Sequence, residues 1–190
     1  MKQKILDTSI HLFDKKGFTE TSVQEIVEAL DVTKGSFYYY FKNKQELLAD
    51  IHLNFIEFLL RNQEEILHDE SRNCQEKLRA MIFMIIHSIK DRKKSARIFF
   101  REMRNLGEIY LEQIVKKRDQ FRKNFQTLIE EGIEKGEFQA DMDPDMITRG
   151  ILGMTNWSYY WFDPEGDISA DELTTIYLEM ILNGIHKKAD

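Results

Sequence analysis

Residues 33–44 read TKGSFYYYFKNK, and this stretch decides the fold. Its first nine residues hold three tyrosines and two phenylalanines, and its only charges are lysines. Phe37 and Phe41 are four residues apart, so they share one face of a helix and can point into a core. The tyrosines between them cannot all share that face. The stretch therefore predicts a short helix that turns phenols and ammonium groups toward a polyanion; the alternative is that the rings are plain core and the lysines are solvated.

Directly before this stretch lies the pattern of another short helix. Ser22 and Glu25 have the spacing of a capping box, in which each side chain bonds the other residue's backbone N–H. Asp31 leads through one residue to Thr33, the expected N-cap of the next helix. Two short helices across so short a turn form a helix-turn-helix, whose second helix can enter the major groove of DNA. The apolar residues of the first helix recur at i, i+3, i+4 and i+7: Val23, Ile26, Val27 and Leu30.

The second helix carries groups that suit a DNA groove. Lys34, Gly35 and Ser36 put a cation, a bare backbone and a small hydroxyl at its N-terminal end. Outward phenols can bond a phosphate or lie against a thymine methyl group. Lys42 and Lys44 flank the helix as expected clamps for the DNA backbone. A local basic face of this kind is compatible with the net charge of −6 for the whole chain.

The DNA-binding signature of TetR-type transcriptional repressors resembles residues 17–48, which read GFTETSVQEIVEALDVTKGSFYYYFKNKQELL. The resemblance covers about residues 4 to 50. It implies an all-α homodimer with two helix-turn-helix heads that read a palindromic operator in double-stranded DNA. The DNA contacts that it implies fall on Thr21, Ser22, Thr33, Lys34, Gly35, Ser36, Tyr38, Tyr39, Tyr40 and Lys44.

The signature differs from the family pattern at two positions. Asp31 occupies the turn where the family often has glycine. Aspartate tolerates the left-handed backbone conformation better than most residues, so we expect the turn to be kept. Tyr40 stands where histidine is frequent, which changes the expected base preference at that position.

The rest of the chain is also patterned for helices. We predict an all-α fold of about nine helices. Residues 1–47 form the helix-turn-helix head, and residues 48–190 form a larger ligand-binding and dimerisation domain. A polar stretch, roughly residues 62–76, is expected to separate the first four helices from the others. The last helix is expected to carry apolar residues as far as Ile185.

The last two predicted helices are the expected dimer interface. Small residues let two backbones approach closely, and apolar residues fill the remaining surface. Two helices from each protomer would form a four-helix interface. The alternative is packing within one chain. The residues assigned to the interface are Gly150, Gly153, Met154, Ile176, Met180 and Gly184.

The aromatic middle of the chain is the expected effector site. Arg97, Arg101 and Arg104 fall on one helical face and suggest a basic rim over an apolar cavity. Such a site suits an amphiphile with an anionic head, and a fatty acyl-CoA fits because arginine binds phosphate well. GMTNWSYYWFDPEGDIS, residues 152–168, also resembles the ligand domains of TetR-type repressors that answer to acyl-CoA thioesters. The assigned residues are Phe99, Phe100, Arg101, Met103, Arg104, Phe121, Phe125, Trp157, Tyr160 and Trp161.

Alternatives to this effector site remain open. The aromatic residues can be ordinary core, and the arginines can be a solvated face paired with nearby glutamates. The effector can instead be a hydrophobic or cationic drug-like compound. A more distant alternative for the whole chain is a helical protein-interaction bundle that does not bind DNA.

Other classes of protein are disfavoured by the sequence. The histidines have no metal-ligand spacing, and neither a GxGxxG motif nor a P-loop occurs, so we expect no enzyme, metal site or cofactor other than an effector. A single cysteine, Cys74, rules out an internal disulfide and fits the reducing cytoplasm. No run of about 18 apolar residues predicts a membrane span.

Overall fold

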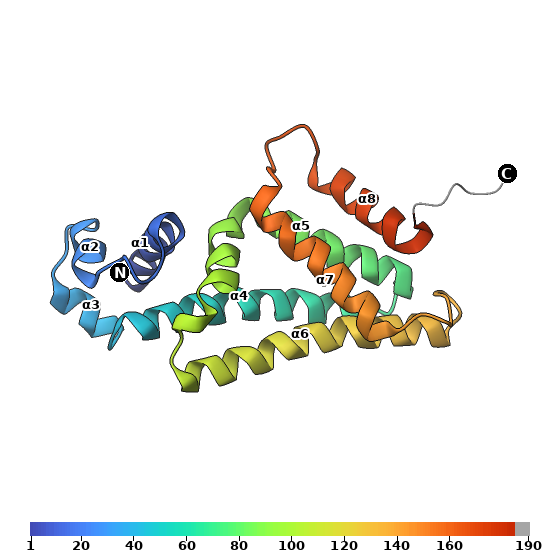
Figure 1. The fold of residues 1–190 in the computed structure, drawn as a ribbon, viewed down its shortest axis with the longest axis horizontal. Helices are drawn as coiled ribbons and strands as arrows, with labels where there is room; N and C mark the ends of the chain where they lie inside the picture. The colour runs from blue at the N-terminus through green and yellow to red at the C-terminus, as the bar shows by residue number, and fades with distance from the viewer. Residues whose placement is uncertain (185–190) are drawn as a thin grey trace. The chain divides into compact units, whose positions relative to one another are not determined.

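The computed structural model describes residues 1–184, and within them it contains α-helices, one short 3-10 helix and no strand (Figure 1). The all-α prediction is confirmed, whereas Ile185 lies outside the described residues. The helices are α1 (Lys2–Lys16), α2 (Val23–Glu28), α3 (Lys34–Tyr40), α4 (Lys44–Leu67), α5 (Cys74–Arg101), η1 (Met103–Asn105), α6 (Glu108–Glu134), α7 (Pro144–Trp161) and α8 (Ala170–Asn183).

Two of the helices are longer than the sequence pattern predicted. The polar stretch near residues 62–76 belongs largely to α4, and only residues 68–73 connect α4 to α5. Gln63 inside this stretch is fully buried, and its amide donates to the Phe121 carbonyl oxygen at 3.0 Å. The two separate helices expected after Leu78 are one continuous helix, α5. Lysine and arginine are good helix formers, so the charged run in its middle does not end it.

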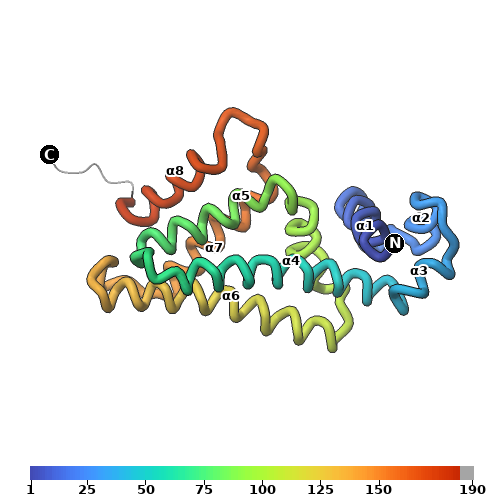
Figure 2. The backbone as a smooth tube through the Cα atoms, turned by 180° about the vertical axis from the view of Figure 1, so that it is seen from behind, coloured from blue at the N-terminus to red at the C-terminus, as the bar shows by residue number. Residues whose placement is uncertain are grey.

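The chain divides into two compact units, and the divisions fall inside α4, α5 and α6. Unit 1 combines Met1–Phe58 with Arg92–Lys117, and unit 2 combines Leu59–Asp91 with Arg118 onward. Each unit therefore joins segments that are far apart in the sequence, as the colours of the tube in Figure 2 make visible. The predicted boundary near residue 47 concerns function and stays a prediction.

Unit 1 has an aromatic core around α1, α3 and α4. Phe37 and Phe41 are both almost completely buried, with ring centroids 5.7 Å apart. Phe13 meets Phe18 edge-on at 5.3 Å. Further along α4, Phe55 packs against Phe99 of α5 at 5.1 Å. This core fixes the base of the helix-turn-helix.

Unit 2 has a core of aliphatic residues crossed by buried hydroxyl pairs. Tyr159 is fully buried on α7, and its hydroxyl lies 2.9 Å from the Ser88 hydroxyl of α5. The Ser158 hydroxyl lies 2.7 Å from the Tyr177 hydroxyl of α8. Each hydroxyl has a partner, so these polar groups are satisfied inside the bundle and fix how α5, α7 and α8 pack.

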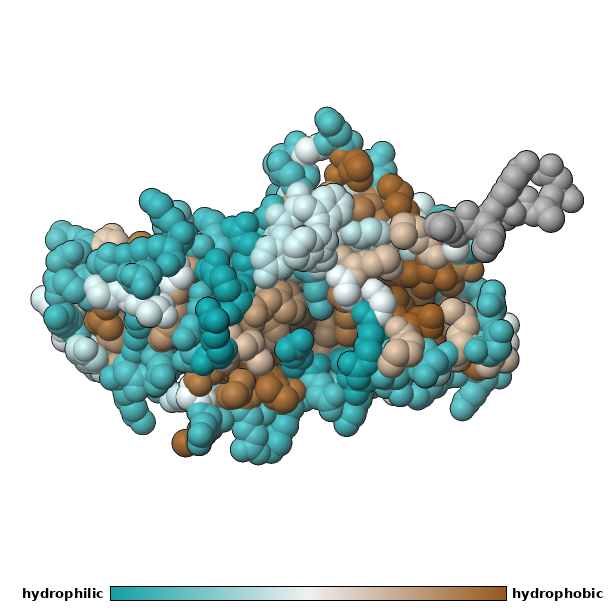
Figure 3. All heavy atoms as spheres, in the orientation of Figure 1, coloured by the Kyte–Doolittle hydropathy of each residue, from teal (hydrophilic) through white to brown (hydrophobic). Residues whose placement is uncertain are grey.

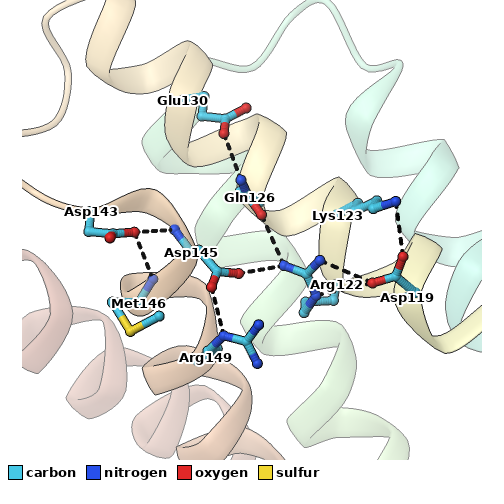
Figure 4. Close-up of polar contacts among 9 residues, drawn as sticks. All are labelled: Asp119, Arg122, Lys123, Gln126, Glu130, Asp143, Asp145, Met146 and Arg149. Atoms are coloured by element: carbon cyan, nitrogen blue, oxygen red, sulfur yellow. Dashed lines mark hydrogen bonds and ion pairs between the residues drawn. The ribbon is translucent and has the colours of Figure 1, made fainter.

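A charged network joins α6 to the first turn of α7 (Figure 4). Arg122 donates to Asp145 at 2.5 Å and to Asp119 at 3.0 Å. The other Asp145 oxygen accepts from Arg149 at 2.7 Å. Asp143 caps α7 by accepting backbone N–H groups of residues 145 and 146. The predicted cap at Asp143 is therefore confirmed.

Candidate nucleic-acid interface

The helix-turn-helix begins with a capping box at the N-terminus of α2. The Glu25 N–H donates to the Ser22 hydroxyl at 3.2 Å, and the Ser22 N–H donates to the Glu25 carboxylate at 2.8 Å. The Glu25 carboxylate also pairs with the Lys16 ammonium of α1. The hydrogen bond from Lys16, followed by those from Ser22, lowers the pKa of Glu25 to about 2. The predicted capping box is confirmed, and it fixes the start of α2 against the end of α1.

The turn between α2 and α3 is tight and uses a left-handed residue. Asp31 has a φ of 52°, the only positive φ among the described non-glycine residues. The Val32 N–H returns to the Val27 carbonyl oxygen at 3.0 Å. Aspartate therefore keeps the turn where the family often has glycine, as predicted. Thr33 then caps α3 by accepting the Ser36 N–H.

Helix α3 turns its phenylalanine inward and its tyrosines outward. The exposed fractions are 0% for Phe37, 53% for Tyr38, 81% for Tyr39 and 36% for Tyr40. The rings of Tyr39 and Tyr40 meet edge-on at 4.8 Å. Rings exposed to this degree are rare on a surface without a partner, because each leaves a large apolar area in water. The predicted orientation of these side chains is confirmed, whereas their contact with DNA stays a prediction.

The N-terminal end of α3 is open to solvent. The exposed residues there include Thr33, Lys34 and Gly35, and Ser36 is half-buried. A Cβ added to Gly35 would meet only the Thr33 hydroxyl, at 3.5 Å, so the glycine is not required by packing within the chain. Ser22 at the start of α2 is exposed as well. These residues together form the candidate DNA-binding surface with the tyrosines of α3.

Two predicted DNA contacts point inward instead. Thr21 is fully buried, and its hydroxyl donates to the Gly17 carbonyl oxygen at 2.8 Å. The Lys44 ammonium donates to the carbonyl oxygens of Phe18 at 2.7 Å and of Thr21 at 2.6 Å. Neither side chain is free to meet a phosphate in this structure, so the prediction for these two is corrected. Sequence reasoning missed this because the partners of Lys44 lie more than 20 residues before it.

The predicted basic rim binds protein in this structure. Arg97 donates to the Asp14 carboxylate at 2.8 Å, and Arg101 donates to the Phe13 carbonyl oxygen at the end of α1. Arg101 also pairs with Glu102, which is buried and lies 3.4 Å from the Phe18 N–H. These arginines therefore hold α1 against α5. No local signal in the sequence predicts such pairs, because their members are more than 80 residues apart.

The side chains predicted to line an effector cavity do not form one group. Phe99 is buried in unit 1 beside His52 and Phe55, with ring centroids 5.3 and 5.1 Å away. Phe121 and Phe125 are buried in unit 2 with ring centroids 5.4 Å apart. The half-buried or exposed members in unit 1 are Phe100, Arg101, Met103 and Arg104.

Three other predicted cavity residues lie on the surface of α7. The exposed fractions are 64% for Trp157, 42% for Tyr160 and 47% for Trp161. The prediction that they line an enclosed cavity is therefore wrong for the single chain. Their placement fits the other assignment made for these helices, a surface that a second protomer covers.

Helices α7 and α8 present an apolar face to solvent (Figure 3). Gly150 and Gly153 are exposed, and a Cβ at either would meet nothing within 4 Å. Together with Trp157 they follow helical spacing along one face of α7. On α8 the corresponding residues are Ile176 and Met180, which are 45% and 44% exposed. Met154 is half-buried and Gly184 ends α8 with a φ of 65°.

His52 is a polar group that the sequence pattern placed on an apolar stripe. It is fully buried on α4, and its Nδ1 lies 2.9 Å from the Leu48 carbonyl oxygen. Its Nε2 has no hydrogen-bond partner. Burial lowers the pKa of His52, although the Leu48 and Phe99 carbonyls and the Glu102 charge oppose this. Within residues 1–184 no His, Cys, Asp or Glu cluster has the arrangement of a metal site, and no helix is long and apolar enough to cross a membrane.

Comparison with known proteins adds relatives that match nearly the whole chain. The HTH-type transcriptional repressor KstR2 of Mycolicibacterium smegmatis is 27% identical over 185 residues, which are 97% of this chain and 90% of that protein. The fatty acid metabolism regulator protein of Bacillus subtilis is 26% identical over 200 residues, covering 99% of this chain and 100% of that protein. The crystal structure of AibR in complex with isovaleryl coenzyme A and operator DNA has a TM-score of 0.85 at 23% identity, covering 95% of this chain and 97% of that one.

Two family profiles account for most of the sequence. The profile described as "Bacterial regulatory proteins, tetR family" matches residues 5–51. The profile described as "Tetracyclin repressor-like, C-terminal domain" matches residues 71–185. The first covers the helix-turn-helix, and the second covers more than half of the chain. The matched relatives are regulators of transcription and not enzymes. The chain therefore belongs to the TetR family of bacterial regulatory proteins.

Proposed function

We propose that this protein is a dimeric, cytoplasmic repressor that binds a palindromic operator through α3 and releases it when a small amphiphile binds its helical body. The observation that carries the proposal is the exposure of Tyr38 and Tyr39 on a helix whose Phe37 is fully buried. Buried phenylalanine fixes the helix, and exposed phenols beside lysines have no use within the chain. A DNA duplex supplies both the negative charge and the apolar base edges that such a surface fits.

The proposed DNA contacts divide into two kinds. Lys34 and Lys42 are exposed and carry the charge that neutralises phosphates. Gly35 permits close approach, and Ser36 with Tyr39 is placed to reach base edges in the major groove. The remaining proposed contacts to phosphate or base are Ser22, Thr33, Tyr38 and Tyr40.

Dimerisation is proposed to occur through the exposed face of α7 and α8. The face combines exposed glycines with Trp157 and Met180, which are 64% and 44% exposed in the single chain. A second copy seated on it would cover apolar surface that is costly to leave in water. In a dimer, two copies of α3 separated by about 34 Å would enter successive major grooves. An effector that favours another spacing would weaken operator binding by its differential affinity for the two states.

The finer proposal is that the effector is a fatty acyl-CoA. Its support is the full-length likeness to a regulator named for fatty acid metabolism and the acyl-CoA bound to AibR. At 23% identity the likeness to AibR bears on the fold alone, so the choice of effector rests mainly on the first relative. The arginine rim gives less support than its sequence pattern suggested, because Arg97 and Arg101 are bound to α1. Arg104 stays exposed for a phosphate.

A direct test combines operator binding with ligand-dependent melting. The probe is a duplex selected by the wild-type protein from a random pool, and binding is measured across salt concentrations. We expect a steep inverse dependence on salt, because a dimer neutralises many phosphates. Recovery of no preferred duplex would contradict the regulator and leave the protein-interaction bundle.

The effector class is tested on the same protein. We expect acyl-CoAs of medium or long chain to raise the melting temperature and to release the duplex, whereas free coenzyme A should do neither. A ligand that binds only the released state stabilises it in proportion to its affinity. If acyl-CoAs have no effect while a cationic or aromatic drug-like compound raises the melting temperature, the acyl-CoA proposal is contradicted and the regulator stands.

A further inference from the structure

We propose that Lys44 is a positioning residue that closes the helix-turn-helix from the inside and does not contact phosphate. The inference rests on the proposed operator binding and assigns a different role to a residue at its edge. The Lys44 ammonium nitrogen lies 2.7 Å from the Phe18 carbonyl oxygen, 2.6 Å from that of Thr21 and 3.5 Å from that of Thr19. An ammonium has three donors and no acceptor, so three converging carbonyl oxygens use all of them.

The surroundings of Lys44 reinforce this geometry. Its ammonium lies 4.2 Å from the centroid of the Phe18 ring, within the range of a cation–π interaction. Phe18 is itself buried and packs edge-on against Phe13. Burial lowers the pKa of Lys44, while the charges of Glu20, Glu25 and Glu102 oppose this effect. The side chain is thus built into the wall of the head and is not a free arm on its surface.

The position of these contacts along the chain gives Lys44 its role. The carbonyl groups of residues 18–21 precede α2, and Lys44 is the first residue of α4, just after α3. The ammonium therefore ties the chain before the helix pair to the chain after it. Helices of six and seven residues are too short to hold their direction alone. Their orientation depends on how their ends are held, so Lys44 helps to set where Tyr39 points.

A move of Lys44 to a phosphate would undo this closure. The carbonyl oxygens that it leaves would lose their charged donor, and Thr21 is fully buried in that turn. An unsatisfied buried acceptor is costly, and the turn would have to rearrange to reach water. Lys42, two residues earlier, is exposed and can meet a phosphate without this cost. The two lysines therefore form a matched pair, one turned inward and one turned outward.

The test measures operator binding of Lys44→Met, Lys44→Arg and Lys42→Ala full-length proteins across salt concentrations. The probe is the duplex selected by the wild type, at a temperature where unfolding curves show every variant to be folded. Methionine keeps an apolar stem near Phe18 and removes the donors. We expect Lys44→Met to melt lower and bind at least tenfold more weakly, with the salt slope of the wild type. Lys42→Ala should keep its melting temperature and lose about one from the slope.

Each outcome bears on the inference. A slope reduced by about one in Lys44→Met means that Lys44 meets a phosphate, and unchanged affinity in the folded variant means that it only stabilises; both overturn the proposal. Lys44→Arg keeps the charge but cannot fit a planar fork to three converging oxygens. We expect it to bind more weakly with an unchanged slope, whereas a phosphate clamp would be preserved by arginine. Failure of the wild type to select any duplex would instead contradict the proposed function.

Discussion

At the scale of single residues, the tyrosines of α3 separate stability from recognition. Tyr39 is 81% exposed and contacts mainly Tyr40, whereas Phe37 two positions earlier is fully buried. The same type of substitution at these two positions must therefore have opposite consequences. One removes surface that is in water, and the other opens a cavity under the helix.

Tyr39→Ala is expected to weaken operator binding by about 1–3 kcal/mol, the range of a good base contact, and to leave the melting temperature unchanged. Phe37→Ala is the matched control, with an expected loss of about 3–5 kcal/mol in the free energy of unfolding. Operator titration and urea denaturation measure the two quantities. A Tyr39→Ala protein that binds as tightly as the wild type would remove Tyr39 from the interface.

His52 makes the stability of the protein depend on pH. Its pKa is lowered by burial, so the unfolded state binds a proton that the folded state does not. The free energy of unfolding should fall as the pH drops below about 6.5, by up to about 1.4 kcal/mol per pH unit from this group. His52→Leu should flatten that part of the profile, and the exposed His68→Leu serves as control. Equal slopes in the wild type and His52→Leu between pH 6.5 and 5 would show that His52 does not contribute.

At the scale of helices, the end of α1 is held by α5. The Asp14 side chain is 11% exposed, and its partner Arg97 is 28% exposed. Arg101 binds the carbonyl oxygen of Phe13 beside them. This pair is partly shielded from water, so the loss of one member leaves the other charge poorly solvated.

Arg97→Ala is therefore expected to cost about 2 kcal/mol of unfolding free energy, below the range for a fully buried pair. The double variant Asp14→Ala with Arg97→Ala should cost less than the sum of the two single variants. Urea denaturation of the four proteins gives the coupling energy. Additive effects would mean that the pair contributes no more than a solvated surface pair.

These elements also show what the sequence can predict. The caps at Ser22, Thr33 and Asp143 were predictable, because each involves groups two or three residues apart. The inward phenylalanine and outward tyrosines of α3 followed from helical spacing. The ends of α4 and the continuity of α5 were not predictable from polarity alone, since charged residues are accommodated on the outer face of a long helix.

The errors at the candidate site have a common physical cause. Lys44, Arg97 and Arg101 look like solvated cations in sequence, yet each is bound by groups distant along the chain. The indoles of Trp157 and Trp161 look like cavity walls, yet they lie on the surface. Hydrophobicity predicts that a side chain needs cover, but it does not tell whether the cover comes from the same chain or from another.

At the scale of the whole molecule, assembly is the property that the single chain leaves incomplete. The face of α7 and α8 exposes aromatic and aliphatic residues together with glycines that meet nothing within 4 Å. A regulator that reads a palindrome needs two copies, and this face is the proposed place for the second.

Trp157→Glu combined with Met180→Glu is expected to convert a dimer into a monomer and to lower operator affinity at least a hundredfold. Charges at the centre of an apolar interface have to be desolvated without a partner, which is costly. Analytical ultracentrifugation measures the mass, and circular dichroism verifies that the helices remain. Ile109→Glu, at an 84% exposed position outside this face, is the control. A double variant that sediments like the wild type would place the interface elsewhere.

The hold of α5 on the end of α1 limits how this protein can be dissected. The segment matched as DNA-binding ends at residue 51, but the compact unit that contains it also draws on residues 92–117. A fragment cut after residue 51 keeps Lys44 and loses Arg101 and Glu102, which bond the backbone of Phe13 and Phe18. Chimeras that graft the first 51 residues onto another family member will inherit a stable reading head only if the recipient offers an equivalent arginine and carboxylate at those places.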